Sequence, residues 1–464
     1  MKGLVIIMEP IMSKPKYVLR EINDLKDMLE QTVALHSEDD AFIKKAKDVY
    51  VGVSYKKYKE DVFGLGTELL KRNIKGDKLI LLSENRYEWC VSFMATTCNG
   101  GIIVPISPEI SESELISRIN HVRGKFIIFS EKYRELIRNI RKKCPTLEYT
   151  IDMDAIIDDN ENLSLLRLIE LGNKAIINGE NEFAKLEINK DDIAGIFYGD
   201  TIVKGKGVML SHKNLVSAVM GIVSFLPITN QDKTSVFLSL SDISQCISNF
   251  LVMINQGGTV YFSEKNKGIC ETLKDTNPTV IFLSKGLLRK IYDNIWTDLG
   301  GMPNVRKVKI LMFISTVLIK FNIDLRKKLF KDVLKNFGKN LKSIVLIGKE
   351  VKNKMLNDFH TFGIDTVQCY EVLEVSSVVM VNNKREFVKD NVIGVPLPGL
   401  KACIFSSGNK SSGEIVLKGD NVMVGYYDDR KATKKVIDDE FLYTGKSGYR
   451  DKKGYFYEIK NNKE

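Results

Sequence analysis

The chain has 464 residues, of which 44% are hydrophobic and 28% charged, and its formal net charge at pH 7 is +10. This length allows two or three lobes with large buried cores, and the composition is ordinary for a soluble globular protein. The lysines are interspersed with acidic residues, so a solvated lysine-rich surface is favoured over a nucleic-acid or membrane-surface patch.

The cysteines and the apolar segments restrict the compartment. Seven cysteines occur singly with no Cys-x-x-Cys pair, which argues against a zinc site or a disulfide framework and favours a reducing cytoplasm. The N-terminal segment is interrupted by Glu9 and Pro10 and precedes no small-residue cleavage site, unlike a secretory signal. No segment approaches the roughly 20 apolar residues of a membrane span. We therefore expect a cytoplasmic protein without a membrane span.

Strands and helices alternate through most of the chain. Short runs rich in Ile, Val and Leu predict strands, and apolar residues at helical spacing predict helices between them. The predicted strands are 51–55, 78–83, 100–105, 125–129, 193–198, 208–210, 236–240, 258–262, 279–283 and 342–347. Helices are predicted over 18–35 and 58–74, after Asn85 and Ser111, and over 305–337, whose apolar stripe we interpret as a core or groove-lining face. This alternation predicts parallel α/β layers.

Two segments depart from this alternation. Residues 152–190 are polar and acidic, and we expect them to form a surface connector. From Val378 onward, short strands and turns predict a small antiparallel barrel or sheet. The predicted fold is therefore α/β, with two parallel-sheet lobes over 16–376 and a β-rich, barrel-like subdomain over 377–464.

The stretch from Asp191 to Leu215 carries the main functional signal. An apolar run is followed by a polar loop with glycine and lysine, a second apolar run, and Ser211 as a helix cap. Such a loop after a strand is where α/β proteins hold phosphates, because bare backbone N–H groups approach the oxygens and lysine supplies charge. The alternative is that Gly205 and Gly207 are turn glycines, which is commoner for an isolated pair.

This stretch resembles the phosphate loop of the AMP-forming adenylating family, which includes acyl-CoA synthetases, luciferases and the adenylation domains of peptide synthetases. Tyr198 and residues 206–215 match the family pattern, but residues 199–204 lack its Ser-Gly-Thr-Thr-Gly core and are one position short. The resemblance implies a weakened phosphate site. Its remaining cofactor-binding candidates in the loop are Thr201, Lys204, Gly205 and Gly207, together with the catalytic candidate Lys206.

A second match lies at residues 368–374. The family reads Gly-Tyr-Gly-x-Thr-Glu there, and this chain keeps Tyr370 and Glu374. The resemblance implies that Tyr370 stacks on adenine and that Glu374 is a catalytic residue that holds Mg²⁺. Glu371 and Leu373 replace the glycine and the threonine, and a carboxylate close to an adenylate adds bulk and like charge.

Two more matches are altered at functional positions. Gly348 keeps one position of the family's adenine slot, whereas Lys349 and Glu350 replace small residues. Lys446 stands where the family has an aspartate that accepts both ribose hydroxyls, and a lysine is a donor only. The family's hinge arginine position reads Asn461, and we expect the C-terminal cap domain with its catalytic lysine to be missing.

Further matches resemble the long-chain fatty acyl branch of the family, and two functions remain open. The first is a pseudoenzyme-like relative of long-chain fatty-acid–CoA ligases, impaired or inactive, that keeps the fold and binds a fatty acid. The alternative is an active ATP-dependent adenylating enzyme, completed by a separate C-terminal domain. The losses cluster on catalytic positions while scaffold residues such as Gly394 and Pro396 persist, which favours the first.

The resemblance also implies ligands and cofactors. ATP or AMP with Mg²⁺ are the expected cofactors, with weakened or absent binding. A fatty acid is the expected ligand, CoA is expected only if a C-terminal domain is supplied, and no nucleic-acid partner is expected.

Overall fold

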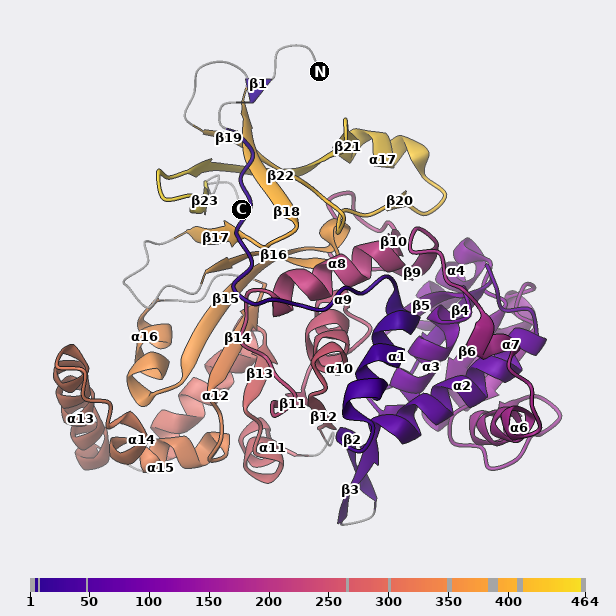
Figure 1. The fold of residues 1–464 in the computed structure, drawn as a ribbon, viewed down its shortest axis with the longest axis horizontal. Coiled ribbons are helices and arrows are strands. Elements are labelled where there is room, and N and C mark those ends of the chain that lie inside the picture. The colour runs from indigo at the N-terminus through magenta and orange to yellow at the C-terminus, as the bar shows by residue number, and fades with distance from the viewer. Residues whose placement is uncertain are drawn as a thin grey trace.

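The computed structural model describes residues 5–6, 9–46, 49–263, 267–298, 302–348, 353–382, 391–406 and 412–459. Three β-sheets form the frame of these residues, and helices cover the sheets and fill the space between them (Figure 1). The predicted alternation of strands and helices is confirmed.

The first lobe is built on an eight-stranded sheet. Its central strands are almost wholly buried, as expected for parallel strands that are covered by helices on both faces. The parallel strands are β4 (Lys78–Leu82), β5 (Ile102–Ile106), β6 (Phe126–Phe129), β7 (Tyr149–Asp152), β8 (Leu163–Ser164) and β9 (Ile193–Phe197). Two antiparallel strands, β10 (Val208–Ser211) and β20 (Gly425–Tyr426), continue the sheet beyond β9.

Seven helices surround this sheet. Each has an apolar side that packs on the sheet or on a neighbouring helix. They are α1 (Leu25–His36), α2 (Tyr55–Lys71), α3 (Tyr87–Thr97), α4 (Glu112–Val122), α5 (Arg134–Ile140), α6 (Leu165–Ile177) and α8 (His212–Val223). The predicted cap of α8 is confirmed, because Ser211 and Asn214 exchange side-chain to backbone hydrogen bonds in a capping box.

A small four-stranded sheet lies beside the first lobe. It contains β11 (Lys233–Val236), β12 (Thr259–Phe262), β2 (Asp40–Ala46) and β3 (Val49–Ser54), in that order. The helical segment between β11 and β12 consists of α9 (Ile243–Gln245), a π-helical turn (Cys246–Leu251) and α10 (Val252–Gln256). We predicted a strand at 236–240, and β11 instead ends at Val236, which is paired with Phe262.

The third sheet joins the second lobe to the β-rich region. Its parallel strands are β13 (Val280–Leu283), β14 (Ser343–Ile347) and β15 (Asp365–Val372). The antiparallel strands are β16 (Ser377–Asn382), β17 (Val392–Pro396), β23 (Phe456–Glu458), β22 (Phe441–Arg450), β19 (Ser412–Gly419), β18 (Leu400–Ser406) and β1 (Val5–Ile6), and β21 (Ile437–Asp438) pairs with β22. The proposed boundary after residue 376 therefore lies between two strands of one sheet, since β15 pairs with β16.

The helices of the second lobe and the β-rich region complete the fold. They are α11 (Ile269–Thr276), α12 (Lys285–Asp298), α13 (Met302–Lys320), α14 (Arg326–Leu329), α15 (Lys331–Leu334), α16 (Asn353–Phe362) and α17 (Arg430–Val436). The single long helix predicted over 305–337 is wrong, because α13 ends at Lys320 and two short helices follow. Its stripe is also only partly a core face: Val308 is buried, whereas Phe313 is 72% exposed.

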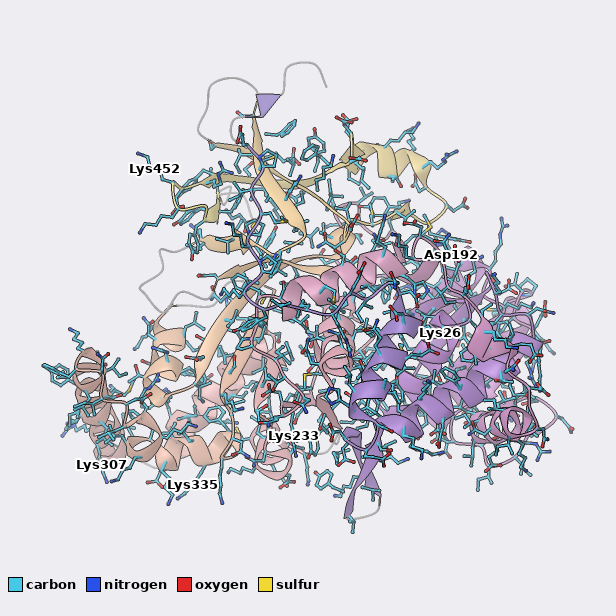
Figure 2. The ribbon with its side chains drawn as sticks, viewed as in Figure 1. Lys26, Asp192, Lys233, Lys307, Lys335 and Lys452 are labelled. Atoms are coloured by element: carbon cyan, nitrogen blue, oxygen red, sulfur yellow. The ribbon has the colours of Figure 1, made fainter. Side chains whose placement is uncertain are left out.

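The segment expected to be a surface connector, 152–190, contains α6 and the short helix α7 (Glu182–Lys185). Helix α6 packs directly on α2: a Cβ added to Gly172 would lie 1.8 Å from the carbonyl oxygen of Gly64. Lys26 of α1 lies inside this lobe (Figure 2), and its ammonium donates to the carbonyls of Phe183, Ala184 and Leu186 at 2.8, 2.9 and 2.6 Å. These contacts hold the segment against α1.

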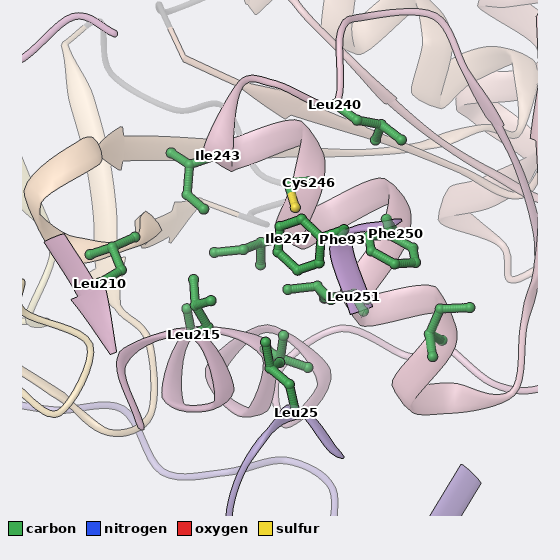
Figure 3. Packing of buried hydrophobic residues seen from close by; sticks show 14 of the residues in the cluster. Leu25, Phe93, Leu210, Leu215, Leu240, Ile243, Cys246, Ile247, Phe250 and Leu251 are labelled. Carbon is green, nitrogen blue, oxygen red and sulfur yellow. The ribbon is translucent and has the colours of Figure 1, made fainter. Parts of the chain in front are cut away.

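The largest core lies where α1, α3, α8 and the π-helical turn meet (Figure 3). The turn supplies apolar side chains that are wholly buried, and the facing helices supply Leu25, Phe93 and Leu215. Phe250 and Phe93 meet edge to face with ring centroids 5.7 Å apart, a favourable aromatic geometry. This core joins the first lobe to the strands that carry the candidate site.

Candidate functional site

The predicted site residues lie around the carboxyl ends of β14 and β15 and the loop that joins β9 to β10. Gly348 follows β14, Tyr370 lies in β15, and Glu374 lies in the turn after β15. Residues 199–207 form the β9–β10 loop, and β20 brings Tyr426 next to it. Ligands of open α/β sheets bind at such carboxyl edges, which makes this the expected place for a site.

Glu374 is the centre of this arrangement. Its side chain is buried, with 1% of the residue exposed, and Oε1 accepts hydrogen bonds from the Ile202 N–H at 2.6 Å and from the Tyr426 hydroxyl at 2.7 Å. The other oxygen, Oε2, is buried and has no hydrogen-bond partner in the described part of the chain. Burial raises the pKa of Glu374, and the two donors oppose that rise.

The β9–β10 loop is closed on this carboxylate by its own hydrogen bonds. Thr201 is buried, and its hydroxyl donates to the carbonyl of Val203 at 2.8 Å. The Val203 N–H points to the Tyr426 hydroxyl at 3.3 Å. The donors that the resemblance would assign to phosphate oxygens are thus directed at groups of the chain itself.

In the β9–β10 loop, Lys206 and Gly207 contact other parts of the chain, whereas Lys204 and Gly205 are exposed. Lys206 forms an ion pair with Asp429 at 2.8 Å and holds the pKa of that carboxyl below its usual range. Lys204 is exposed, and Gly205 has φ +74° with open space around its Cα, as in an ordinary turn. A Cβ on Gly207 would lie 2.8 Å from Ile196, so this glycine is required for packing. Gly205 thus has the geometry of a turn glycine, whereas Gly207 is a packing glycine.

Glu371 occupies the space beside Gly348. Its Oε2 accepts a hydrogen bond from the Ser244 hydroxyl at the start of the helical segment after β11, and its Oε1 lies 3.0 Å from where a Cβ of Gly348 would stand. Burial raises the pKa of Glu371, and the charge of Asp200 raises it further. Tyr370 is half-buried, and burial raises the pKa of its phenol. A carboxylate therefore stands next to the position where the resemblance places adenine.

A lysine stands at the position where the resemblance places a ribose-binding aspartate. Lys446 of β22 lies 3.6 Å from the carboxylate of Glu458, so its ammonium faces an acceptor within the chain. The preceding Thr444 is buried and donates to the carbonyl of Ile415 at 2.7 Å. Lys349, Glu350 and Asn461, which the sequence also singled out, lie outside the described residues.

Mg²⁺ does not fit the residues as they stand. Mg²⁺ takes several oxygen ligands and keeps part of its water shell, whereas Glu374 offers one enclosed oxygen. No group of three or more His, Cys, Asp or Glu side chains suited to a metal is found within the described ranges. Asp200 lies close enough to Glu371 and Glu374 for its charge to raise the pKa of both, after the larger effect of burial, so three carboxyl groups gather here.

The loop that contains Thr201 lies beside Glu374 through the Ile202 N–H, and sequence reasoning missed the residues that close the site. Tyr426 lies 52 residues from Glu374 and appeared only as part of a family-matching Gly-Tyr-Tyr run. Ser244 lies 127 residues from Glu371 and carried no signal of its own. Asp429 follows the same run, and its position as the N-cap of α17 was the only available clue.

A separate cavity of about 470 Å³ lies at the opposite, amino ends of β13, β14 and β15. Its apolar lining includes Phe225, Ile228, Val345 and Val367. Lys16 and Lys342 also line it, and the Lys16 ammonium lies 3.6 Å from the centre of the Phe225 ring. Asp232 and Asp365 line it as well, and the Lys342 ammonium lies 3.7 Å from the Asp232 carboxylate. The cavity thus combines apolar walls with charged groups of both signs, and Lys16 is the cation that faces its apolar part.

The chain is similar to known proteins along most of its length. A sequence model described as AMP-binding enzyme matches residues 29–427. Probable 4-coumarate–CoA ligase 3 of Dictyostelium discoideum is 27% identical over 89% of this chain and 73% of that protein. Long-chain-fatty-acid–CoA ligase 5 of Rattus norvegicus is 25% identical over 87% of this chain, and the match spans 63% of the rat protein.

Solved structures with the same fold include the N-terminal domain of FACL13 from Mycobacterium tuberculosis. The likeness covers 95% of this chain and 100% of that one, with a TM-score of 0.75 and 17% identity. O-succinylbenzoate coenzyme A synthetase from Bacillus subtilis covers 95% of this chain, with a TM-score of 0.70 and 19% identity. At these identities the likeness establishes the fold, and the predicted α/β architecture is confirmed.

Proposed function

Because the chain belongs to the AMP-binding enzyme family, we propose that it is a fatty-acid-binding relative of the long-chain fatty-acid–CoA ligases in which adenylate formation is impaired. The observation that carries this proposal is the state of Glu374. Its Oε1 is held by the chain's own donors at 2.6 and 2.7 Å, and Oε2 is enclosed. The carboxylate acts as a structural tie between three distant segments.

Two neighbouring features support the proposal. Glu371 places a carboxylate beside Gly348, and Ser244 orients it there, so an adenine ring would meet both bulk and charge. Lys446 presents a cation to Glu458 where an acceptor for ribose hydroxyls is expected. Each change acts against a different part of a nucleotide, and together they disfavour adenylation more than any one alone.

The fatty-acid part of the proposal is supported by the cavity at the amino ends of β13–β15. Its volume of about 470 Å³ lies within the usual range of small-molecule sites. Apolar walls would hold an acyl chain, and Lys16 would attract its carboxylate, with Lys342 shared between that carboxylate and Asp232 at 3.7 Å. We also propose that the protein is cytoplasmic. The seven free cysteines support this location, because thiols stay reduced there.

The alternative is an active ATP-dependent adenylating enzyme. One observation favours it: Oε2 of Glu374 is a buried oxygen without a partner, and a carboxylate oxygen is the ligand type that Mg²⁺ prefers. This reading requires the loop with Ile202 to move away from Glu374 when nucleotide binds. Titration with nucleotide separates the two candidates.

The experiment is calorimetric titration of the purified chain with ATP and Mg²⁺, followed by titration with a long-chain fatty acid and the matching fatty alcohol. We expect no heat of binding when ATP is added to about millimolar concentration, which means a binding free energy weaker than roughly −4 kcal/mol. The chain should still show a cooperative thermal unfolding transition, because it is folded. Saturable micromolar binding of ATP would overturn the impairment and support the active enzyme.

The fatty-acid arm has its own variants. Lys16→Met with Lys342→Met should weaken binding of the acid and leave binding of the alcohol unchanged, because only the acid carries a charge. Lys452→Met, an exposed lysine remote from the cavity, is the matched control. Equal loss of acid and alcohol binding, or no fatty-acid binding by the unaltered protein, would contradict this part of the proposal.

A further inference from the structure

Helix α13 lies at the edge of the second lobe (Figure 1), and several of its large apolar side chains are exposed. Phe313 is 72% exposed and Ile310 61%, and Phe321, directly after the helix, is 72% exposed. Ile314 and Val317 are exposed as well. Scattered exposed apolar residues are normal in proteins, but two nearly bare phenylalanines within one short segment are not.

The exposed apolar residues form one stripe. Residues 310, 313, 314, 317 and 321 follow the spacing i, i+3, i+4, i+7 and i+11, which places them on one side of a helix. The opposite side is already used for packing: Val308 and Ser315 are buried, and the Ser315 hydroxyl faces the carbonyl of Thr361 on α16 at 3.5 Å. The outer stripe therefore has no packing role among the described elements.

Basic residues border this stripe. On a helix of 3.6 residues per turn, Lys307 lies to one side of it, and Lys309 and Lys320 lie to the other. The sequence has no aspartate or glutamate between residues 298 and 324. No ion pair of these three lysines occurs within the described ranges, and Lys307 lies on the outer end of the molecule (Figure 2). Residues 299–323 thus combine the apolar stripe with charges that are all positive, and the nearby carboxylates are Asp332, close to Lys307, and Asp358, close to Lys309, on neighbouring helices.

We infer that α13 docks on the surface of an anionic lipid bilayer, with the stripe inserted at the headgroup level and the lysines directed to the lipid phosphates and carboxylates. A second copy of this chain would bring the same positive charges together, so self-association through this face is disfavoured. A bilayer surface matches both the apolar stripe and the flanking cations. No helix within the described ranges has the length and apolarity needed to cross a bilayer, which is consistent with a helix that lies on the surface.

The test is cosedimentation of the full chain with vesicles of phosphatidylcholine alone and of phosphatidylcholine mixed with phosphatidylserine. We expect binding to the mixed vesicles that weakens with salt. Phe313→Ser with Phe321→Ser, and separately Lys307→Glu with Lys320→Glu, should each lower the partition coefficient by about tenfold or more. All four positions are exposed, so the thermal unfolding midpoint should stay unchanged.

The matched controls alter residues of the same kind and similar exposure that lie outside α13. Ile156→Ser with Ile157→Ser removes two apolar side chains that are 77% and 67% exposed, and Lys452→Glu with Lys453→Glu reverses two exposed lysines. Both controls should bind vesicles as the unaltered chain does. Absence of binding to mixed vesicles, or binding by the phenylalanine variant equal to that of the unaltered chain, would overturn the inference. Self-association abolished by the phenylalanine variant without vesicle binding would assign the stripe to a second copy and overturn it too.

Discussion

Replacing Tyr426 by phenylalanine tests whether Glu374 is a structural tie. The substitution removes a hydroxyl that donates to the buried Glu374 carboxylate at 2.7 Å and accepts from the Val203 N–H at 3.3 Å. A hydrogen bond to a charged group contributes about 1.5–3 kcal/mol, and both partners are buried, so we expect a loss of about 2–3 kcal/mol at pH 8. The longer contact adds little, because 3.3 Å exceeds the usual range.

The assay is urea unfolding of four proteins: the unaltered chain, Tyr426→Phe, Glu374→Gln and the double variant. In the glutamine background the hydroxyl meets a neutral acceptor, so its removal should cost only about 1 kcal/mol, which leaves a coupling of about 1–2 kcal/mol. Burial raises the pKa of Glu374 in the folded protein. The stability contributed by the protonated Glu374 side chain is therefore lost as the pH rises through this raised pKa. In Glu374→Gln, which does not titrate, the free energy of unfolding should depend less on pH in that range. A Tyr426→Phe cost below about 0.5 kcal/mol, or equal costs in both backgrounds, would refute the reasoning.

Four further substitutions, one of them a control, test the packing of the fold by the same unfolding measurement. Gly172→Ala places a Cβ 1.8 Å from the Gly64 carbonyl oxygen and should lower the free energy of unfolding by about 3 kcal/mol. The control is Gly286→Ala in α12, where space is open, and it should raise the free energy of unfolding by up to about 1 kcal/mol. Similar effects of the two substitutions would contradict the packing of Gly172 on Gly64. Lys26→Met leaves three carbonyls without their donor and should cost about 2 kcal/mol or more; a neutral result would show that water replaces the ammonium. Burial lowers the pKa of His212 from its ordinary 6.5 to about 4. The neutral imidazole therefore contributes stability above pH 6.5, and about 3 kcal/mol of it is lost as the pH falls toward 4. His212→Gln should remove this pH dependence of the free energy of unfolding. An unchanged slope would assign it to other groups.

Local patterns predicted the repeating part of the fold well. The run at 78–83 became β4 (Lys78–Leu82), and Ser211 caps α8 with Asn214, because periodicity and capping depend on residues close in sequence. The polar segment 152–190 was harder to interpret, since α6 is fixed by the close approach of Gly172 to Gly64, more than a hundred positions away. A glycine that allows two helices to touch carries no local signal.

The sequence indicated which residues to consider for the site, but not the hydrogen bonds that connect them. The resemblance assigned Glu374 and Thr201 to one site, and in the structure the residue after Thr201, Ile202, donates its N–H to Glu374. That Tyr426 donates to Glu374, and that Ser244 holds Glu371, depends on which strands lie side by side, and this follows from tertiary packing. The apolar pattern of α13 gave two stripes, and periodicity could not say which one the protein buries.

The position of β23 in the third sheet has a consequence for biosynthesis. Residues 456–458 pair with β17 on one side and β22 on the other, so a strand near the end of the described chain lies inside the sheet rather than at its edge. While the chain emerges from the ribosome, β17 and β22 keep unpaired backbone groups until residues 456–458 have been made. Premature termination upstream of residue 456 would leave both edges open, and such a fragment should aggregate or be degraded rather than accumulate as a folded protein.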